Sequence, residues 1–214
     1  MAYDLEEQEQ IATLKSWWKT YGNLVTWTLI VVLSAYSAWT GWQYYQRNQA
    51  QQAAQLYDEM ERAVDSKDAE RIQRIAADLK DKFGRTDYAQ MGALAHARQA
   101  FDQRDLATAK SELQWVIKDG KNAEYQAVAR IRLAGILLDE KAYDEGLKLL
   151  AAGFPTNFVA LASDRKGDLL AAQGKRDEAR KAWQEALDRM GAAHPGRQLI
   201  QIKLDALGGT PANA

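Results

Sequence analysis

The sequence contains few residues that could support catalysis. His96 and His194 are its only histidines, and no cysteine occurs. A catalytic or metal site needs several polar groups that converge, but neither histidine has a second one four residues away, and His194 stands beside Pro195 in an expected turn. The G-x-S-x-G, P-loop and G-x-G-x-x-G motifs are also missing from the sequence. We therefore predict a protein that is not an enzyme and that holds no cofactor or metal.

The charged residues indicate solvated surfaces rather than a site. The formal net charge is −1, so no general positive field would attract nucleic acid. Acidic runs such as Asp58-Glu59 and Asp139-Glu140 are typical of exposed helix faces. The lack of cysteine excludes disulfides and thiolate metal sites, and it is compatible with an oxidising compartment. We predict no nucleic-acid partner and no small-molecule substrate.

An uncharged stretch from Thr20 to Gln46 divides the chain. Its apolar centre has the length of about 20 residues that a helix needs to cross a bilayer. The acidic residues before it and the length of the apolar run are unlike a cleaved secretory signal. We therefore predict an uncleaved transmembrane helix over 21–46, preceded by a short acidic, amphipathic segment over 1–20; a buried helix of a soluble protein is the alternative. Lys and Arg are nearly balanced on the two sides, which leaves the orientation open.

The flanks of this stretch carry residues that suit a membrane interface. Trp and Tyr side chains favour the headgroup layers, and Lys and Arg side chains reach the phosphates from helix ends. The predicted interface anchors are Trp17, Trp18, Lys19, Trp39, Trp42, Tyr44, Tyr45 and Arg47. Small residues on one face allow another membrane helix to approach closely. The predicted packing face consists of Ser34, Ala35, Ala38 and Gly41.

The residues after the span show a helical pattern. Apolar or small residues recur at intervals of three and four, as in Leu106, Ala109 and Leu113, without the alternation of strands. The pattern predicts helices over 48–66, 69–83, 87–103, 106–118, 122–140, 143–152, 157–173, 177–190 and 197–207. The predicted fold class is all-α: a single transmembrane helix followed by one helical domain over 47–214.

The predicted helices form a repeat. The small residues Ala109, Gly146 and Ala179 occupy equivalent places, 37 and 33 residues apart. A helix–turn–helix unit of about 34 residues is the tetratricopeptide repeat, in which small residues let paired helices cross closely. We predict a tetratricopeptide-like α-solenoid with a degenerate first unit over about 52–83 and a C-terminal capping helix within 194–207.

The first helix of each tetratricopeptide unit lines the concave side of the stack. A mixed apolar groove with an acidic end would suit an extended or helical segment of another protein. The alternative is that these residues belong to the core of a short array. The predicted groove residues are Met91, Leu94, Arg98, Phe101, Val128, Ile131, Leu138, Asp164 and Asp168.

The order of several motifs resembles the YfgM-type family. These motifs are Leu14-Lys15-Ser16-Trp17-Trp18-Lys19, Gly41-Trp42-Gln43-Tyr44-Tyr45, and the segments 164–175, 179–183 and 200–204. The resemblance implies a bacterial inner-membrane protein with a cytoplasmic N-terminus and a periplasmic repeat domain. It also implies an ancillary subunit of the SecYEG translocon that passes translocated client proteins to periplasmic chaperones, together with a membrane-anchored prolyl-isomerase-like partner.

Two other functions stay open from the residues alone. The same repeats would serve a membrane-anchored scaffold for another envelope complex, in division or cell-wall synthesis. Alternatively, the acidic tail would act as a regulator. The proteins that co-purify with the chain would distinguish these functions.

Overall fold

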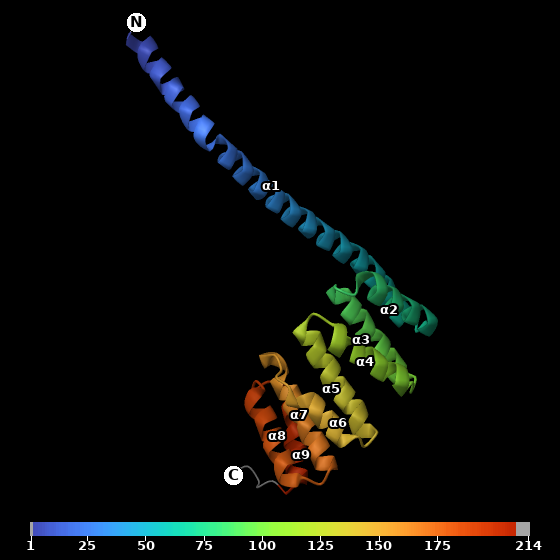
Figure 1. Ribbon diagram of the computed structural model, residues 1–214. Helices are drawn as coiled ribbons and strands as arrows, with labels where there is room; N and C mark the ends of the chain where they lie inside the picture. Colours follow the sequence, from blue (N-terminus) through green and yellow to red (C-terminus); the bar gives the residue numbers. More distant parts are fainter. Residues whose placement is uncertain (1, 209–214) are drawn as a thin grey trace. The chain divides into compact units, whose positions relative to one another are not determined.

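The computed structural model describes residues 2–208, with side chains from residue 7 onward. Every regular element in this range is an α-helix, which confirms the all-α class (Figure 1). The helices are α1 (Ala2–Asp65), α2 (Ala69–Phe83), α3 (Asp87–Asp102), α4 (Leu106–Asp119), α5 (Ala123–Asp139), α6 (Tyr143–Ala151), α7 (Thr156–Ala172), α8 (Arg176–Arg189) and α9 (Gly196–Ala206). The chain divides into two compact units, one up to Gln49 and one from Ala50.

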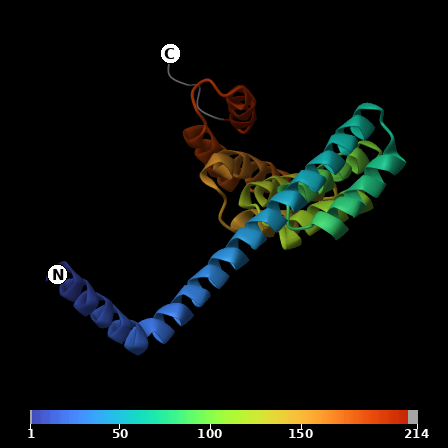
Figure 2. The same cartoon turned by 90° about the horizontal axis from the view of Figure 1, so that it is seen from above.

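Helix α1 runs without interruption to Asp65, so the predicted start of a new helix at residue 48 is wrong. The residues around that point, Gln46-Arg47-Asn48-Gln49-Ala50, include no proline or glycine, and most are good helix formers. Nothing in the local sequence therefore ends the helix there. Figure 2 shows that α1 bends in its N-terminal part. In this part Thr13, Ser16 and Thr20 donate side-chain hydrogen bonds to backbone carbonyls three or four residues earlier. Such hydrogen bonds tend to bend helices.

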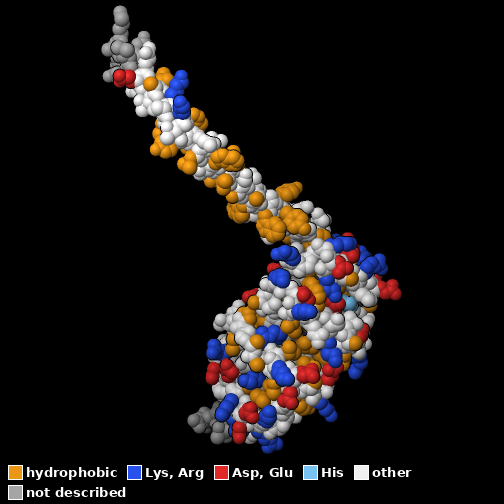
Figure 3. Space-filling view, in the orientation of Figure 1, with side chains coloured by type: hydrophobic (Ala, Val, Ile, Leu, Met, Phe, Trp, Pro, Cys, Tyr) orange, Lys and Arg blue, Asp and Glu red, His pale blue; other side chains and the backbone are white. Residues whose placement is uncertain are grey.

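The first unit exposes an apolar surface. Among the described residues, α1 from Glu7 onward is the one helix long and apolar enough to cross a membrane, with a mean hydropathy of 1.4 over its best window and none of that window buried. Orange side chains cover this part of α1 in Figure 3. Exposed apolar surface of this extent marks a site of contact with lipid or with protein.

The second unit is a stack of paired helices. Each helix from α2 to α9 packs on the next one along the chain, and α5 also contacts both α3 and α7 (Figure 1). The end of α1 joins the stack, since Ala53, Met60 and Ala63 share a buried cluster with residues of α2 and α3. The pairs are therefore the end of α1 with α2, α3 with α4, α5 with α6, and α7 with α8, with α9 packed on the last pair. This arrangement confirms the predicted tetratricopeptide-like repeats.

The turns inside the pairs repeat as well. Lys67, Arg104, Lys141 and Gly174 all have positive φ, and they follow one another at 37, 37 and 33 residues. Only glycine adopts this left-handed conformation without a steric cost, so the first three turns are held by the packing of the helices on either side. The same turn at Lys67 identifies the degenerate first unit as a true member of the repeat.

Small residues mark the points where neighbouring helices cross, both within a pair and between successive pairs. Ala109 and Ala179 are fully buried. A Cβ atom at Gly146 would lie 2.9 Å from Leu169 Cδ2, and one at Gly167 would overlap the indole ring of Trp183. The large side chains of α7 and α8 thus fill the space that the small residues leave, as the sequence predicted.

This close approach makes Gly167 intolerant of alanine. The variant Gly167→Ala should lose about 1–3 kcal/mol of unfolding free energy through overpacking against Trp183, which outweighs the gain of about 1 kcal/mol in helix propensity. Gly135→Ala is the matched control, because Gly135 also lies within a helix but its added Cβ would be 3.5 Å from the nearest atom. Thermal unfolding of the purified chain in mild detergent, followed by circular dichroism, should show a lower Tm for the first variant only. Equal Tm values would contradict the close crossing.

Candidate binding groove

A cavity of about 320 Å³ opens between the first helices of three successive pairs. Its floor is apolar: Leu113 and Ile136 are buried, whereas Phe101 has 41% of its surface exposed at the edge. The lining residues are Ala97, Arg98 and Phe101 of α3, Leu113 of α4, Arg132, Gly135, Ile136 and Asp139 of α5, and Arg165 of α7. Two predicted groove residues, Arg98 and Phe101, are thus brought together here.

Three arginines supply the charge of this cavity. Arg98 Nε lies 2.9 Å from the Asp102 carboxylate, one turn along the same helix, and Arg165 Nη1 lies 3.3 Å from Asp168. Arg132 forms no hydrogen bond or ion pair with any residue that the structure describes. The Arg132 side chain is partly open to solvent. Partial loss of water around its guanidinium lowers the pKa of Arg132, and the positive charge of Arg98 lowers it further. The guanidinium stays charged at any physiological pH, and Asp139 lines the same cavity.

The other predicted apolar groove residues lie around this cavity or beneath it. Leu94 is buried in the core between α3, α4 and α5, and Val128 packs against the same core. Ile131 and Leu138 pack against a second core between α5, α6 and α7, and Met91 is half-buried. Leu94 therefore has an intramolecular packing role, and a binding role for the remaining four stays a prediction.

The two predicted aspartates hold the capping helix. Lys203 Nζ of α9 lies 2.7 Å from Asp164 Oδ1 and 2.7 Å from Asp168 Oδ1. The indole nitrogen of Trp183 donates to the Asp164 carbonyl at 3.2 Å and to Asp168 Oδ1 at 3.3 Å. Neither aspartate is among the residues that line the cavity, although Asp168 pairs with Arg165, which does line it.

Sequence reasoning missed Arg132 and Arg165. A signal was present for two of the arginines, because Arg132 and Arg165 are 33 residues apart, the same spacing as the turn residues Lys141 and Gly174 of their units. Residues at one repeat position on successive first helices face the same side of the stack. The search for apolar and acidic groove residues passed over this regularity.

His96 belongs to a separate buried cluster. Its Nδ1 lies 3.2 Å from Glu112 Oε1, and Lys80 Nζ lies 2.6 and 2.8 Å from the two oxygens of the same carboxylate. The side chains of His96 and Glu112 are each only 8% exposed. Burial raises the pKa of Glu112, but His96 and Lys80 together lower it by more, so the pKa lies below its ordinary value of 4.5. The cluster joins α2, α3 and α4, and no set of three or more potential metal ligands occurs among the described residues.

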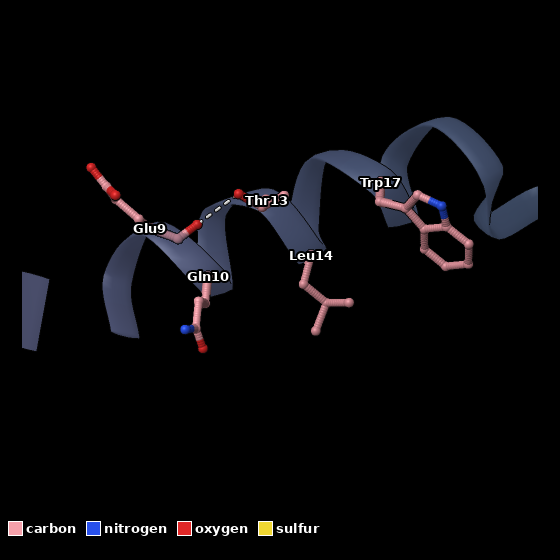
Figure 4. Close-up of a pocket in the computed structure, with 5 residues that line it drawn as sticks. All are labelled: Glu9, Gln10, Thr13, Leu14 and Trp17. Atoms are coloured by element: carbon pink, nitrogen blue, oxygen red, sulfur yellow. Dashed lines mark hydrogen bonds between the residues drawn. The ribbon is translucent and has the colours of Figure 1, made fainter. Parts of the chain in front are cut away.

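The predicted membrane residues all lie along α1 and are exposed. Trp17, Trp39 and Trp42 each expose about half of their surface or more, as do the other predicted aromatic anchors. A Cβ at Gly41, in the predicted packing face, would meet no atom within 4 Å. A shallow depression on α1 is lined by Glu9, Gln10, Thr13, Leu14 and Trp17 (Figure 4). All five come from one helix and close no space between elements, so this depression is not a binding site by itself.

Comparison with known proteins decides the family. A sequence profile described as a tetratricopeptide repeat-like domain matches residues 15–209. The ancillary SecYEG translocon subunit of Neisseria gonorrhoeae (strain ATCC 700825 / FA 1090) is 34% identical over 208 residues, which cover 97% of this chain and 100% of that protein. The chain belongs to this family. The finding confirms the resemblance to the YfgM-type family.

More distant members of the family align as well. The ancillary SecYEG translocon subunit of Haemophilus influenzae (strain ATCC 51907 / DSM 11121 / KW20 / Rd) is 24% identical over 207 residues, 97% of this chain and 100% of the relative. That of Escherichia coli (strain K12) is 27% identical over 135 residues, 63% of each chain. The family is one of non-catalytic repeat proteins, in agreement with the prediction that this chain is not an enzyme.

The buried Glu112 cluster predicts a specific pH dependence. Because the pKa of Glu112 is lower in the folded chain, its contribution to stability is present above pH 4.5 and is lost as the pH falls through the folded pKa. Glu112→Gln should cost about 3 kcal/mol at pH 7, since it leaves Lys80 without a buried partner, and should flatten the loss of stability as the pH falls below 4.5.

The control is Glu140→Gln. Glu140 lies 2.7 Å from Lys110 in an ion pair whose side chains are both about one-third exposed, so its loss should cost under about 1 kcal/mol. Denaturant unfolding at a series of pH values measures both variants. If Glu112→Gln lost no more stability than Glu140→Gln at pH 7, the structural role of the cluster would be wrong.

Proposed function

We propose that this protein is a membrane-anchored adaptor that associates with the SecYEG translocon and binds other polypeptides through its repeat unit. The observation that carries the proposal is the alignment over nearly the whole chain with proteins named as ancillary SecYEG translocon subunits. An anchoring helix and a groove without catalytic groups suit such an adaptor, since an adaptor acts by binding alone.

Helix α1 supplies the anchor in this proposal. Its exposed apolar surface, with aromatic residues at both ends of the apolar stretch, fits a single span of a bacterial inner membrane. The N-terminus lies in the cytoplasm and the repeat unit in the periplasm. The lack of cysteine supports a periplasmic repeat unit, because a stray thiol is a liability in an oxidising compartment.

The small face of α1 provides the contact with the translocon. Ser34, Ala35, Ala38 and Gly41 are exposed in the described chain, and a helix of another subunit can approach such a face closely. The repeat unit then receives newly translocated proteins and passes them to periplasmic chaperones, with a membrane-anchored prolyl-isomerase-like protein as a partner. Confinement in one membrane raises the effective concentration of the partners, so weak contacts suffice.

Affinity purification from bacterial membranes in mild detergent tests the proposal. The full-length chain and a version that ends at Gln49 should both recover SecYEG subunits, whereas periplasmic chaperones should come only with the full-length chain. Ala38→Phe should reduce the recovery of SecYEG, because it fills the packing face. Leu29→Phe is the matched control, since Leu29 lies on the side of α1 opposite Ala38, is exposed, and the substitution also introduces a ring.

Two results would overturn this proposal. Recovery of division or cell-wall synthesis proteins without SecYEG would assign the chain to another envelope complex. Equal loss of SecYEG with Ala38→Phe and Leu29→Phe would remove the small face from the interface.

A further inference from the structure

The N-terminal part of α1 has an apolar side that is open to solvent in the described chain. A helix turns about 100° per residue, so the large apolar side chains between residues 11 and 21 share an arc of about 120°. Each of these residues has between 46% and 66% of its surface exposed. They are Ile11, Leu14, Trp17, Trp18 and Tyr21. Before Ile11 the same side carries Glu7 and Gln10, so the apolar side begins at Ile11. Exposed apolar surface of this kind marks a site of contact.

The opposite side of this segment is polar, and its hydroxyl groups are satisfied within the helix. Thr13 donates to the Glu9 carbonyl at 2.8 Å, and Ser16 donates to the Thr13 carbonyl at 2.8 Å. Thr20 donates to the Ser16 carbonyl at 3.0 Å. All of these residues are exposed. A helix with one apolar side and one polar side is typical of a segment that lies in the surface of a bilayer.

Two lysines lie along one border of the apolar side. Lys15 and Lys19 are one turn apart and exposed, and Lys15 is the neighbour of Ile11 on the helix surface. A lysine at such a border lays its apolar stem along lipid and holds its ammonium group in the headgroup layer. Anionic headgroups attract that charge. The border of the apolar side therefore suits an anionic lipid surface.

The contacts around Gly22 allow α1 to change direction where this segment ends. Figure 2 shows that α1 bends in its N-terminal part. Gly22 is buried beneath the ring of Trp18, and a Cβ atom there would lie 3.0 Å from Trp18 Cε2. The Thr26 hydroxyl donates to the Gly22 carbonyl at 2.7 Å. Glycine and side-chain hydrogen bonds to carbonyls are both common causes of a helix bend. The segment thus does not have to follow the axis of the apolar stretch.

The surface nearest to this apolar side is a lipid bilayer. The part of α1 that follows is apolar enough to cross a membrane, and none of its most apolar window is buried. The apolar side ends at Tyr21, directly before that part begins, so it lies at the level of the headgroups in the proposed span. Trp and Tyr rings favour this layer, and they supply three of the five apolar side chains. The position of the segment and its chemistry therefore agree on lipid as the occupant.

We propose that residues 11–21 lie flat on the cytoplasmic surface of the inner membrane, with the apolar side in the headgroup layer and Lys15 and Lys19 on anionic phosphates. The inference rests on the proposed function, in which α1 crosses that membrane, and it adds a second contact with lipid. A segment held flat prevents the span from turning about its own axis. The small face of α1 then keeps one direction within the membrane.

Site-specific fluorescence of the full-length chain in lipid nanodiscs tests the inference. Because the chain lacks cysteine, Leu14→Cys and Ala12→Cys each allow one environment-sensitive fluorophore to be attached. Both positions are exposed, but they are about 160° apart around the helix, and only Leu14 is on the apolar side. Nanodiscs of phosphatidylethanolamine and phosphatidylglycerol leave both faces of the bilayer open, so the orientation of the chain does not affect the result. Iodide should quench the label at Leu14 at least about threefold less than the label at Ala12.

Substitutions on the two sides link this protection to the apolar side. In the Leu14→Cys chain, Trp17→Gln should raise iodide quenching at least about twofold, because a ring that favours the headgroup layer is lost. Ala12→Gln is the matched control, since it places the same side chain on the polar side, and it should leave quenching unchanged. Nanodiscs of phosphatidylcholine alone should narrow the difference between the Leu14 and Ala12 labels, because Lys15 and Lys19 lose their anionic partners.

Three outcomes would overturn the inference. Equal quenching at Leu14 and Ala12, in nanodiscs that hold this chain alone, would place the segment in water. Protection of Leu14 only when SecYEG shares the nanodisc would assign the apolar side to a translocon helix. Unchanged quenching after Trp17→Gln would separate the protection from the apolar side. An equal difference between the two labels in both kinds of nanodisc would contradict the part assigned to the lysines.

Failure of the proposed function would appear elsewhere, as loss of SecYEG from the purified full-length chain. Nanodiscs without SecYEG measure the contact with lipid alone, so the two failures are distinguishable.

Discussion

Close crossing of paired helices is the constraint on which the repeat unit depends. A single pair of short helices cannot bury its apolar face alone, so each pair must stack on the next one. Only small residues fit where helices approach closely, as Gly167 beneath Trp183 within one pair and Gly146 beneath Leu169 of the next pair demonstrate. Once the crossings are fixed at intervals of 33 to 37 residues, every residue on a first helix has an equivalent on the next, and Arg132 and Arg165 in the cavity wall are one such pair of equivalents.

The two units of the chain differ in where their apolar side chains lie. The unit up to Gln49 exposes apolar side chains that water would not tolerate in a stable monomer, and we propose lipid and translocon helices as its surroundings. The unit from Ala50 buries its apolar residues in four clusters and leaves a charged groove. Ion pairs between helices, such as that of Lys203 with Asp164 and Asp168, fix the end of the stack. We propose that anchoring and recognition belong to separate parts of one chain.

Local signals in the sequence predicted most of the fold. The predicted helix bounds agree closely from α2 onward, because polar N-cap residues such as Asp68 and Asp105 mark the starts. The sequence did not predict that α1 continues past residue 48. The change there from apolar to polar residues was interpreted as the end of one helix, but a change in polarity alone does not end a helix. In the groove, Arg98 and Phe101 were predicted, whereas Asp164 and Asp168 are bound by Lys203 from 35 or more residues away. Such long-range pairing has no local pattern, and it decides which charges face the cavity.

The central proposal is that α1 crosses a membrane, with the residues before the span in the cytoplasm and the repeat unit in the periplasm. The chain lacks cysteine, so Gln8→Cys and Ala193→Cys each introduce a single thiol at an exposed position. Both variants would be treated with a membrane-impermeant maleimide in bacterial cells whose outer membrane has been permeabilised. The account predicts labelling of Ala193→Cys in these cells and of Gln8→Cys only after the inner membrane is lysed. Labelling of Gln8→Cys before lysis, or protection of Ala193→Cys, would contradict it.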